Sequence, residues 1–201
     1  MIVYLTQGGF MMLPLLVCSV LIIAILIDRY NSLKEDRVIP ESLTQLIEDP
    51  NTEPELMNEE AKLNESCLGN IVLVLNENKD KDSNTLYKVL GTSFKKEIHY
   101  LEKGIEVLSV IAAISPLFGL LGTVLGMVDV FNTIGQEGLG QTGIFSAGIA
   151  KALITTIAGL SVSIPALIFH GMLLRKIESQ ATAIEEISQK FLFRLNTTYV
   201  K

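Results

Sequence analysis

The chain has 201 residues, of which 49% are hydrophobic and 19% are charged, and its formal net charge is −6. This length suits either one modest soluble domain or a small bundle of membrane spans, and the mean hydropathy of +0.42 favours the second. The acidic balance excludes the basic surface typical of proteins that bind nucleic acid. We therefore predict an all-α membrane protein whose surroundings are the lipid bilayer.

Charged residues avoid three long windows of the chain: Met1 to Ile27, Val107 to Val128, and Ala152 to Phe169. The third window continues towards the N-terminus past one lysine as far as Gly138. Each window reaches or approaches the roughly 20 residues that a helix needs to cross a bilayer. We predict transmembrane helices at residues 10–28, 106–131 and 143–172.

The first window lacks the marks of a cleaved signal peptide. No basic residue precedes Phe10, and Ile25 to Tyr30 has no pattern of small residues for cleavage. We expect a retained span. Cys18 lies in this window and Cys67 in the polar middle of the chain, so we predict neither a disulfide nor a metal site.

Lysine and arginine concentrate on the cytoplasmic side of membrane proteins. Basic residues follow the first span, precede the second and follow the third: Arg29, Lys34, Arg37, Lys95, Lys96, Lys103, Arg175 and Lys176. This pattern predicts a periplasmic N-terminus and a cytoplasmic C-terminus. The remaining segments are a periplasmic stub at 1–9, a cytoplasmic insert at 29–105, a periplasmic loop at 132–142 and a cytoplasmic helix at 173–201.

The insert has short apolar segments with helical spacing at Glu41 to Ile47 and at Leu68 to Leu75. Between them, Glu48 to Pro54 carries two prolines and an acidic run, which predicts a turn or loop. Asn76 to Asn84 is a second polar break. We expect helices joined by these breaks.

Apolar residues recur every three or four positions from Thr85 onward: Leu86, Leu90, Phe94, Ile98, Leu101 and Ile105. We predict one long helix that continues into the second span. A similar period past the third span predicts a single helix over 143–196, about 80 Å long at 1.5 Å per residue. Helices 2 and 3 are therefore expected to extend into a cytoplasmic helical bundle.

Small residues share one face of each of the last two spans. These are Ser115, Gly119, Gly122, Thr123 and Gly126 in the second span, and Gly148, Ala152, Thr156, Gly159 and Ser163 in the third. Such faces let membrane helices pack closely. Alternatively, they line a lumen in which Thr123 and Thr156 offer oxygens to a partner or an ion. Pro116 and Pro165 each remove a backbone donor and can kink their helices.

Lys151 is an anomaly within the third span, since a lysine near the middle of a span costs about 2.5–3.5 kcal/mol on insertion scales. On a helical wheel it lies near Thr155 and away from Thr156, which places it at a helix or subunit seam. It must pair with an acid, face water, or reach a nearby interface. Candidate acids are Asp129, Glu137 or a residue of another subunit.

No carboxylate lies centrally in any span, although a proton carrier needs a titratable group. If this protein moves protons, the acid is expected to come from another chain. No nucleophile, base or metal cluster is recognisable in the sequence, and we do not expect an enzyme or a bound cofactor.

The segment Ser115 to Met127, read as SPLFGLLGTVLGM, resembles the second-span signature of the ExbB/TolQ/MotA proton-channel family. The segment Gly148 to Leu160, GIAKALITTIAGL, followed by Ser163 to Ala166, resembles the third-span signature. Three spans with a cytoplasmic insert are similar to ExbB or TolQ, because MotA-like stators have four spans.

This resemblance implies a homopentamer in the bacterial inner membrane around two copies of a single-span partner similar to ExbD or TolR. That partner would supply a membrane aspartate, which Thr123 and Thr156 would face. The resemblance also implies a TonB-like or TolA-like component. Proton flow, worth about 2.3 kcal/mol per charge per 100 mV, would then drive the motor.

Lys151 departs from the family, because many relatives have glutamate at this position. The additional hydroxyl of Thr155 beside Thr156 suits Na⁺ as an alternative to H⁺. ExbB-type support of import across the outer membrane is the favoured interpretation. The alternatives are a TolQ-type envelope-maintenance motor, a Na⁺-driven relative, and a membrane scaffold that conducts no ion.

Overall fold

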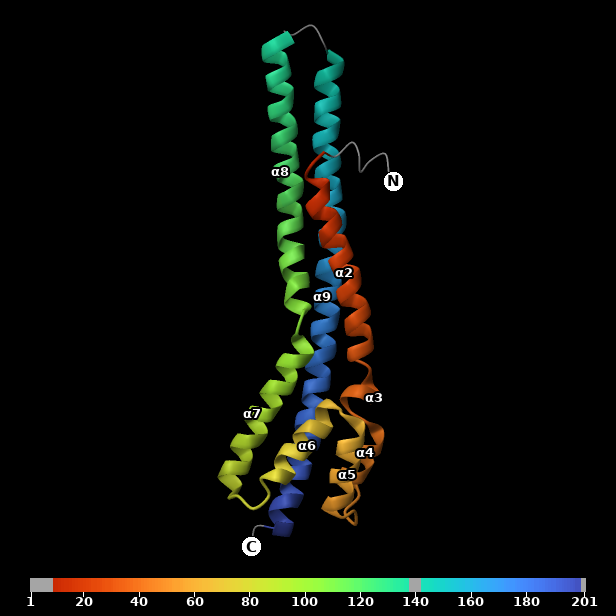
Figure 1. Cartoon of the computed structure of the whole chain (residues 1–201), viewed down its shortest axis with the longest axis vertical. Helices are drawn as coiled ribbons and strands as arrows, with labels where there is room; N and C mark the ends of the chain where they lie inside the picture. The colour runs from red at the N-terminus through yellow and green to blue at the C-terminus, as the bar shows by residue number, and fades with distance from the viewer. Residues whose placement is uncertain (1–8, 138–141, 200–201) are drawn as a thin grey trace. The chain divides into compact units, whose positions relative to one another are not determined.

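The computed structural model describes residues 9–137 and 142–199, which form helices with no strand among them (Figure 1). The helices are α2 (Met12–Ser32), α3 (Glu35–Val38), α4 (Glu41–Glu48), α5 (Pro54–Asn64), α6 (Cys67–Glu77), α7 (Ser83–Glu102), α8 (Ile105–Glu137) and α9 (Thr142–Tyr199). The described part of the chain is therefore all-α, as predicted.

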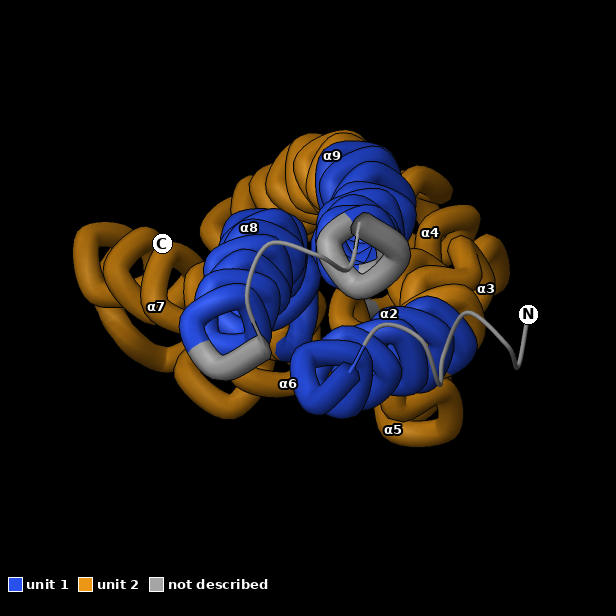
Figure 2. Tube along the Cα trace, turned by 90° about the horizontal axis from the view of Figure 1, so that it is seen from above, with its two compact units in different colours: residues 1–27, 104–172 blue, residues 28–103, 173–201 orange. Residues whose placement is uncertain are grey.

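The chain divides into two compact units (Figure 2). The first consists of Met1–Ile27 and Gly104–Met172, and the second of Asp28–Lys103 and Leu173–Lys201. The first unit contains most of α2, all of α8 and the first part of α9. The second contains α3 to α7 and the last part of α9.

Three helices are long and apolar enough to cross a membrane: Met12–Ser32, Ile105–Gly135 and Gly148–Thr197. They overlap the three predicted spans, and Figure 2 shows the first-unit parts of α2, α8 and α9 as neighbouring tubes. Large apolar side chains such as Leu117, Leu153 and Leu167 remain about 60% exposed. Such a surface is typical of helices that face lipid or other apolar helices.

The second unit has its own hydrophobic core. The amphipathic helix α4 buries Leu43 and Ile47, as its spacing predicts, and α6 buries Leu68 and Leu75. The core is completed by residues of α5, α7 and α9: Met57, Ala61, Leu86, Ile177, Ile184, Phe191 and Leu195. Helix α5 was not predicted, because only Met57 and Ala61 mark its buried face in a polar segment.

The prediction of one helix from Thr85 into the second span is wrong. Helix α7 ends at Glu102 and α8 begins at Ile105, because Gly104 has a φ of +84°. This left-handed conformation is accessible to glycine at little cost and ends helices. The apolar stripe continues across the break, which is why spacing alone suggested a single helix.

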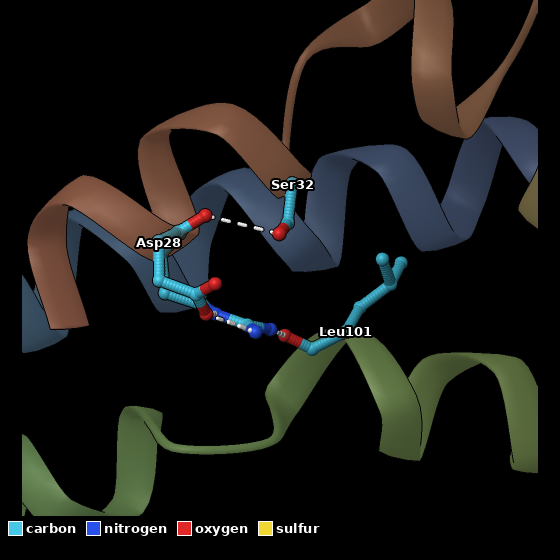
Figure 3. Close-up of polar contacts among 4 residues, drawn as sticks. Asp28, Ser32 and Leu101 are labelled. Atoms are coloured by element: carbon cyan, nitrogen blue, oxygen red, sulfur yellow. Dashed lines mark hydrogen bonds and ion pairs between the residues drawn. The ribbon is translucent and has the colours of Figure 1, made fainter.

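The end of α7 is held by a buried arginine from the C-terminal turn of α2. The Arg29 guanidinium donates to the carbonyl of Leu101 at 3.2 Å. It also pairs with Asp28, and the Ser32 hydroxyl donates to the Asp28 carbonyl at 3.0 Å (Figure 3). A cation is favourable at a helix C-terminus, where carbonyls lack intrahelical donors.

Helix α9 is continuous from Thr142 to Tyr199, which agrees with the single helix predicted over 143–196. The segment predicted as a periplasmic loop at 132–142 is helical as far as Glu137, and a helix resumes at Thr142. The connection between them, 138–141, lies outside the described residues.

Candidate functional site between α8 and α9

The small-residue faces of α8 and α9 pack directly against one another. A Cβ atom on Gly119 would lie 3.0 Å from the Thr155 carbonyl oxygen and 3.0 Å from the Thr156 Cα. A Cβ on Gly159 would lie 2.5 Å from the Ser115 carbonyl oxygen. Because these neighbours are backbone atoms, they cannot move aside, and the glycines are required for the approach.

The same antiparallel register continues along the pair. A Cβ on Gly126 would lie 3.2 Å from that of Ala152, and one on Gly148 would collide with the side chain of Val130. A Cβ on Gly122 would collide with the Thr155 side chain. All five predicted packing glycines therefore lie at the α8–α9 contact, which favours the close-packing interpretation for them.

Hydroxyl groups add hydrogen bonds across this contact. Thr155 Oγ1 donates to the Ala152 carbonyl at 2.7 Å and lies 3.3 Å from the Gly119 carbonyl. Thr156 Oγ1 lies 3.4 Å from the same Gly119 carbonyl. The Gly119 carbonyl of α8 thus lies within hydrogen-bond distance of two threonine hydroxyls of α9, and these contacts fix the register of the two helices.

The three threonines predicted for the ion path differ in accessibility. Thr155 is 1% exposed, and its hydroxyl is directed into the α8–α9 contact. Thr123 and Thr156 are half-buried, and Thr123 Oγ1 donates to the Leu120 carbonyl of its own helix at 2.6 Å. Of these three threonines, Thr123 and Thr156 are therefore the two whose side chains remain partly accessible.

Both predicted prolines lie inside helices that continue past them. Pro116 has no N–H, so the Ala112 carbonyl four residues earlier lacks its intrahelical donor. The Ser163 hydroxyl of α9 donates to that carbonyl at 2.6 Å. A neighbouring helix thus satisfies the backbone group that proline leaves free, as membrane helices require.

Lys151 lies beside two other segments of the same unit. Its Nζ is 4.0 Å from Asp129 Oδ2, one of the two acids in this chain that the sequence offered. The side chain of the other, Glu137, is outside the described residues. A Cβ on Gly9 would lie 2.9 Å from Lys151 Cε, so the chain before α2 also approaches this lysine.

The second unit contains a polar cluster that sequence reasoning missed. The Arg194 guanidinium donates to five backbone carbonyls at the end of α4 and in the loop after it: Leu46, Ile47, Asp49, Pro50 and Thr52. Nearby, Lys190 pairs with Glu48 at 3.0 Å and Glu186 at 3.2 Å. The sequence shows no pattern that would identify carbonyls about 145 residues away as partners.

Among the residues that the structure describes, no group of three or more His, Cys, Asp or Glu side chains is placed to hold a metal ion. Cys67 is buried, and this burial, with a smaller effect from Glu97, raises the pKa of its thiol to about 12. The thiol is therefore protonated at neutral pH, when its nucleophilic thiolate form is negligible.

The described residues thus form an all-α protein with three helices apolar and long enough to cross a membrane, two of which are in close contact through small residues and threonine hydroxyls. The sequence profile of the MotA/TolQ/ExbB proton channel family matches residues 35–186, which include the contact between α8 and α9. The chain belongs to this family.

Similarity to individual proteins agrees with this family assignment. An ExbB-like biopolymer transport protein of Synechocystis is 31% identical over 87% of this chain and 70% of its own length. The biopolymer transport protein ExbB of Aquifex aeolicus is 38% identical over 43% of this chain and 59% of its own length. The Tol-Pal system protein TolQ of Haemophilus influenzae is 29% identical over 55% of this chain and 46% of its own length. Except for the first, the matched regions span less than two thirds of these relatives.

Proposed function

We propose that this chain is the ring subunit of an inner-membrane motor that uses the proton motive force. Five copies surround two copies of a single-span partner similar to ExbD or TolR. The supporting observation is the combination of two accessible hydroxyls, Thr123 and Thr156, with the absence of any acid from residues 107–128 and 152–174. The titratable aspartate then comes from the partner, and these hydroxyls face it.

The close α8–α9 contact supports this arrangement. Because Gly119 accepts both Thr155 and Thr156, the two helices present their hydroxyls from one fixed platform. A fixed platform limits the reorganisation needed as charge passes. Proton movement down the membrane potential supplies about 2.3 kcal/mol per charge per 100 mV, and rotation of the inner dimer uses that energy.

The proposed topology places the N-terminus in the periplasm and the C-terminus in the cytoplasm. Basic residues flank the spans on one side: Arg29 after the first, Lys103 before the second and Arg175 after the third. The part of α9 after Met172 and the helices α3 to α7 form a cytoplasmic helical bundle in this proposal. Their common hydrophobic core supports treating them as one element.

Within the family, we favour the ExbB role, in which a TonB-like component energises import across the outer membrane. Relatives from Synechocystis, Aquifex aeolicus, Salmonella typhimurium and Vibrio cholerae carry ExbB or ExbB-like names, and the one from Synechocystis matches 87% of this chain. The similarity to TolQ supports a TolQ-type motor with a TolA-like component as the second candidate.

The proposal is tested by reconstituting the purified complex in proteoliposomes and following proton uptake with a pH-sensitive dye. Thr156→Ala should abolish most uptake while the complex still assembles, because it removes an accessible hydroxyl but little packing. Thr156→Ser keeps the hydroxyl and serves as the matched control. Full uptake by the Thr156→Ala complex would contradict the proposed path and favour a scaffold that conducts no ion.

The same assay distinguishes a Na⁺-driven motor from a H⁺-driven one. Replacing Na⁺ with K⁺ on both sides of the membrane should leave proton uptake unchanged if H⁺ is the coupling ion. Loss of activity in K⁺ that is restored by added Na⁺ would assign Na⁺ instead.

A further inference from the structure

We infer that Lys151 and Asp129 form an ion pair at the edge of the hydrocarbon layer nearest the α8–α9 connection. There the pair aligns the ends of all three spans. Lys151 is then a positioning residue that does not lie in the middle of the membrane. The contacts that carry this inference all lie within the first unit, and the inference requires only that the helices of that unit span a membrane.

The lengths of the uncharged segments carry the first step. In α8 no charged residue occurs between Glu106 and Asp129, and in α9 none occurs between Lys151 and Arg175. At 1.5 Å per residue these segments are about 33 and 35 Å long. A hydrocarbon layer of about 30 Å fits between the charges in both helices.

The antiparallel register carries the second step. Gly126 packs on Ala152 and Gly148 on Val130, so Asp129 and Lys151 come to the same level of the helix pair. Their charged atoms are 4.0 Å apart, with the side chains 72% and 44% exposed respectively. Asp129 and Lys151 are each the charged residue that borders the uncharged segment of its helix on the side of the α8–α9 connection.

The first span reaches the same level. Gly9 has a φ of +70°, and a Cβ there would lie 3.3 Å from Lys151 Nζ. Its carbonyl accepts from the Met12 N–H at 3.1 Å, in the turn that begins α2. Helix α2 runs about 24 Å from Met12 to Asp28, the first charged residue of the chain, and the turn from Gly9 lengthens this uncharged segment towards the hydrocarbon thickness.

A position at the edge of the hydrocarbon layer removes the energetic cost that Lys151 would have in the middle of the membrane. A lysine at the hydrocarbon edge keeps its ammonium hydrated while its methylenes pack on apolar surface. Helix α8 continues beyond the edge to Glu137, and α9 begins there at Thr142. Thr123 and Thr156 are then about 9 and 8 Å inside the edge, so the pair sets the depth of the accessible hydroxyls.

The level is tested by attaching a nitroxide to single cysteines at two exposed apolar positions of α8 in lipid vesicles. Phe131 is 62% exposed and Val124 is 52% exposed, so Phe131→Cys and Val124→Cys differ mainly in depth. Both variants carry Cys18→Ala and Cys67→Ala. The nitroxide at position 131 should be more accessible to a water-soluble nickel chelate than to oxygen. The nitroxide at position 124 should be more accessible to oxygen than to the chelate. Equal preference for oxygen at both positions would overturn the inference.

The pair itself is tested by Lys151→Gln, Asp129→Asn and their combination in the full chain. Each single change leaves one unpaired charge, and should lower the melting temperature by roughly 2–4 °C. The double change should recover at least half of the summed loss, and the exchange Lys151→Asp with Asp129→Lys should do the same. Strictly additive losses would overturn the pairing.

Discussion

Ser163 of α9 donates a hydrogen bond of 2.6 Å to the Ala112 carbonyl of α8. This carbonyl would normally accept from the residue four positions later, but that residue is Pro116. A proline in one apolar helix is thus matched by a serine in the next. The two apolar helices are therefore joined by a specific hydrogen bond as well as by close packing.

Ser163→Ala should destabilise the protein by about 0.6–1.7 kcal/mol, which lies between the average and the largest contribution measured for hydrogen bonds between membrane helices. The loss should depend on Pro116, because Pro116→Ala restores an intrahelical donor to Ala112. Unfolding the four members of this double-mutant cycle in mixed detergent micelles measures the dependence. An equal cost of Ser163→Ala with and without Pro116 would contradict this role of the serine.

Gly119→Val should prevent the normal α8–α9 approach and cost about 1–3 kcal/mol, as insertion of extra atoms into a packed contact does. Gly171→Val is the matched control, because a Cβ at Gly171 meets nothing within 4 Å. Both changes add the same β-branched side chain, at position 119 in α8 and at position 171 in α9. Thermal unfolding in detergent compares them, and equal melting temperatures would contradict the contact.

Arg194→Met should free the loop between α4 and α5, because five carbonyls lose their donor. We expect a loss of about 2 kcal/mol or more, since one net hydrogen bond contributes about 1 kcal/mol. Faster amide exchange at Asp49, Asn51 and Thr52 would report the change. Lys190→Met, which removes exposed ion pairs only, should leave that exchange nearly unchanged. Equal exchange in both variants would show that Arg194 does not hold the loop.

Cys67 should resist alkylation in the folded protein. With a pKa of about 12, its thiolate fraction at pH 8 is on the order of 10⁻⁴. In a Cys18→Ala background, iodoacetamide should modify Cys67 rapidly only after denaturation. Because folding raises this pKa from 9.0, the thiol favours the folded state below pH 9 and loses that contribution as the pH rises towards 12. Rapid modification of the native thiol at pH 8 would contradict its burial.

The sequence predicted the parts of the fold that depend on long-range composition and spacing. Three uncharged windows gave the three apolar helices, and the spacing of Leu43 and Ile47 gave α4. The break at Gly104 was missed because the apolar stripe passes through it, while a single positive φ decides the backbone. Helix α5 was missed because its few apolar residues are dispersed in an acidic segment.

The candidate site was predicted in part. Sequence spacing placed Gly119, Gly122 and Thr156 on small-residue faces, and the structure brings those faces together. The spacing did not reveal that Thr155 would be buried in the contact, because that depends on the register between two helices. The Ser163 and Arg194 hydrogen bonds depend on tertiary placement in the same way.

The most direct test of the motor account is native mass spectrometry of the complex, gently extracted from its own host through a tag on this chain. The account predicts five copies of this chain with two copies of a single-span protein that carries a membrane aspartate. A TonB-like or TolA-like third component would identify the system served. Recovery only as a monomer or dimer, without such a partner in several mild detergents, would contradict the account.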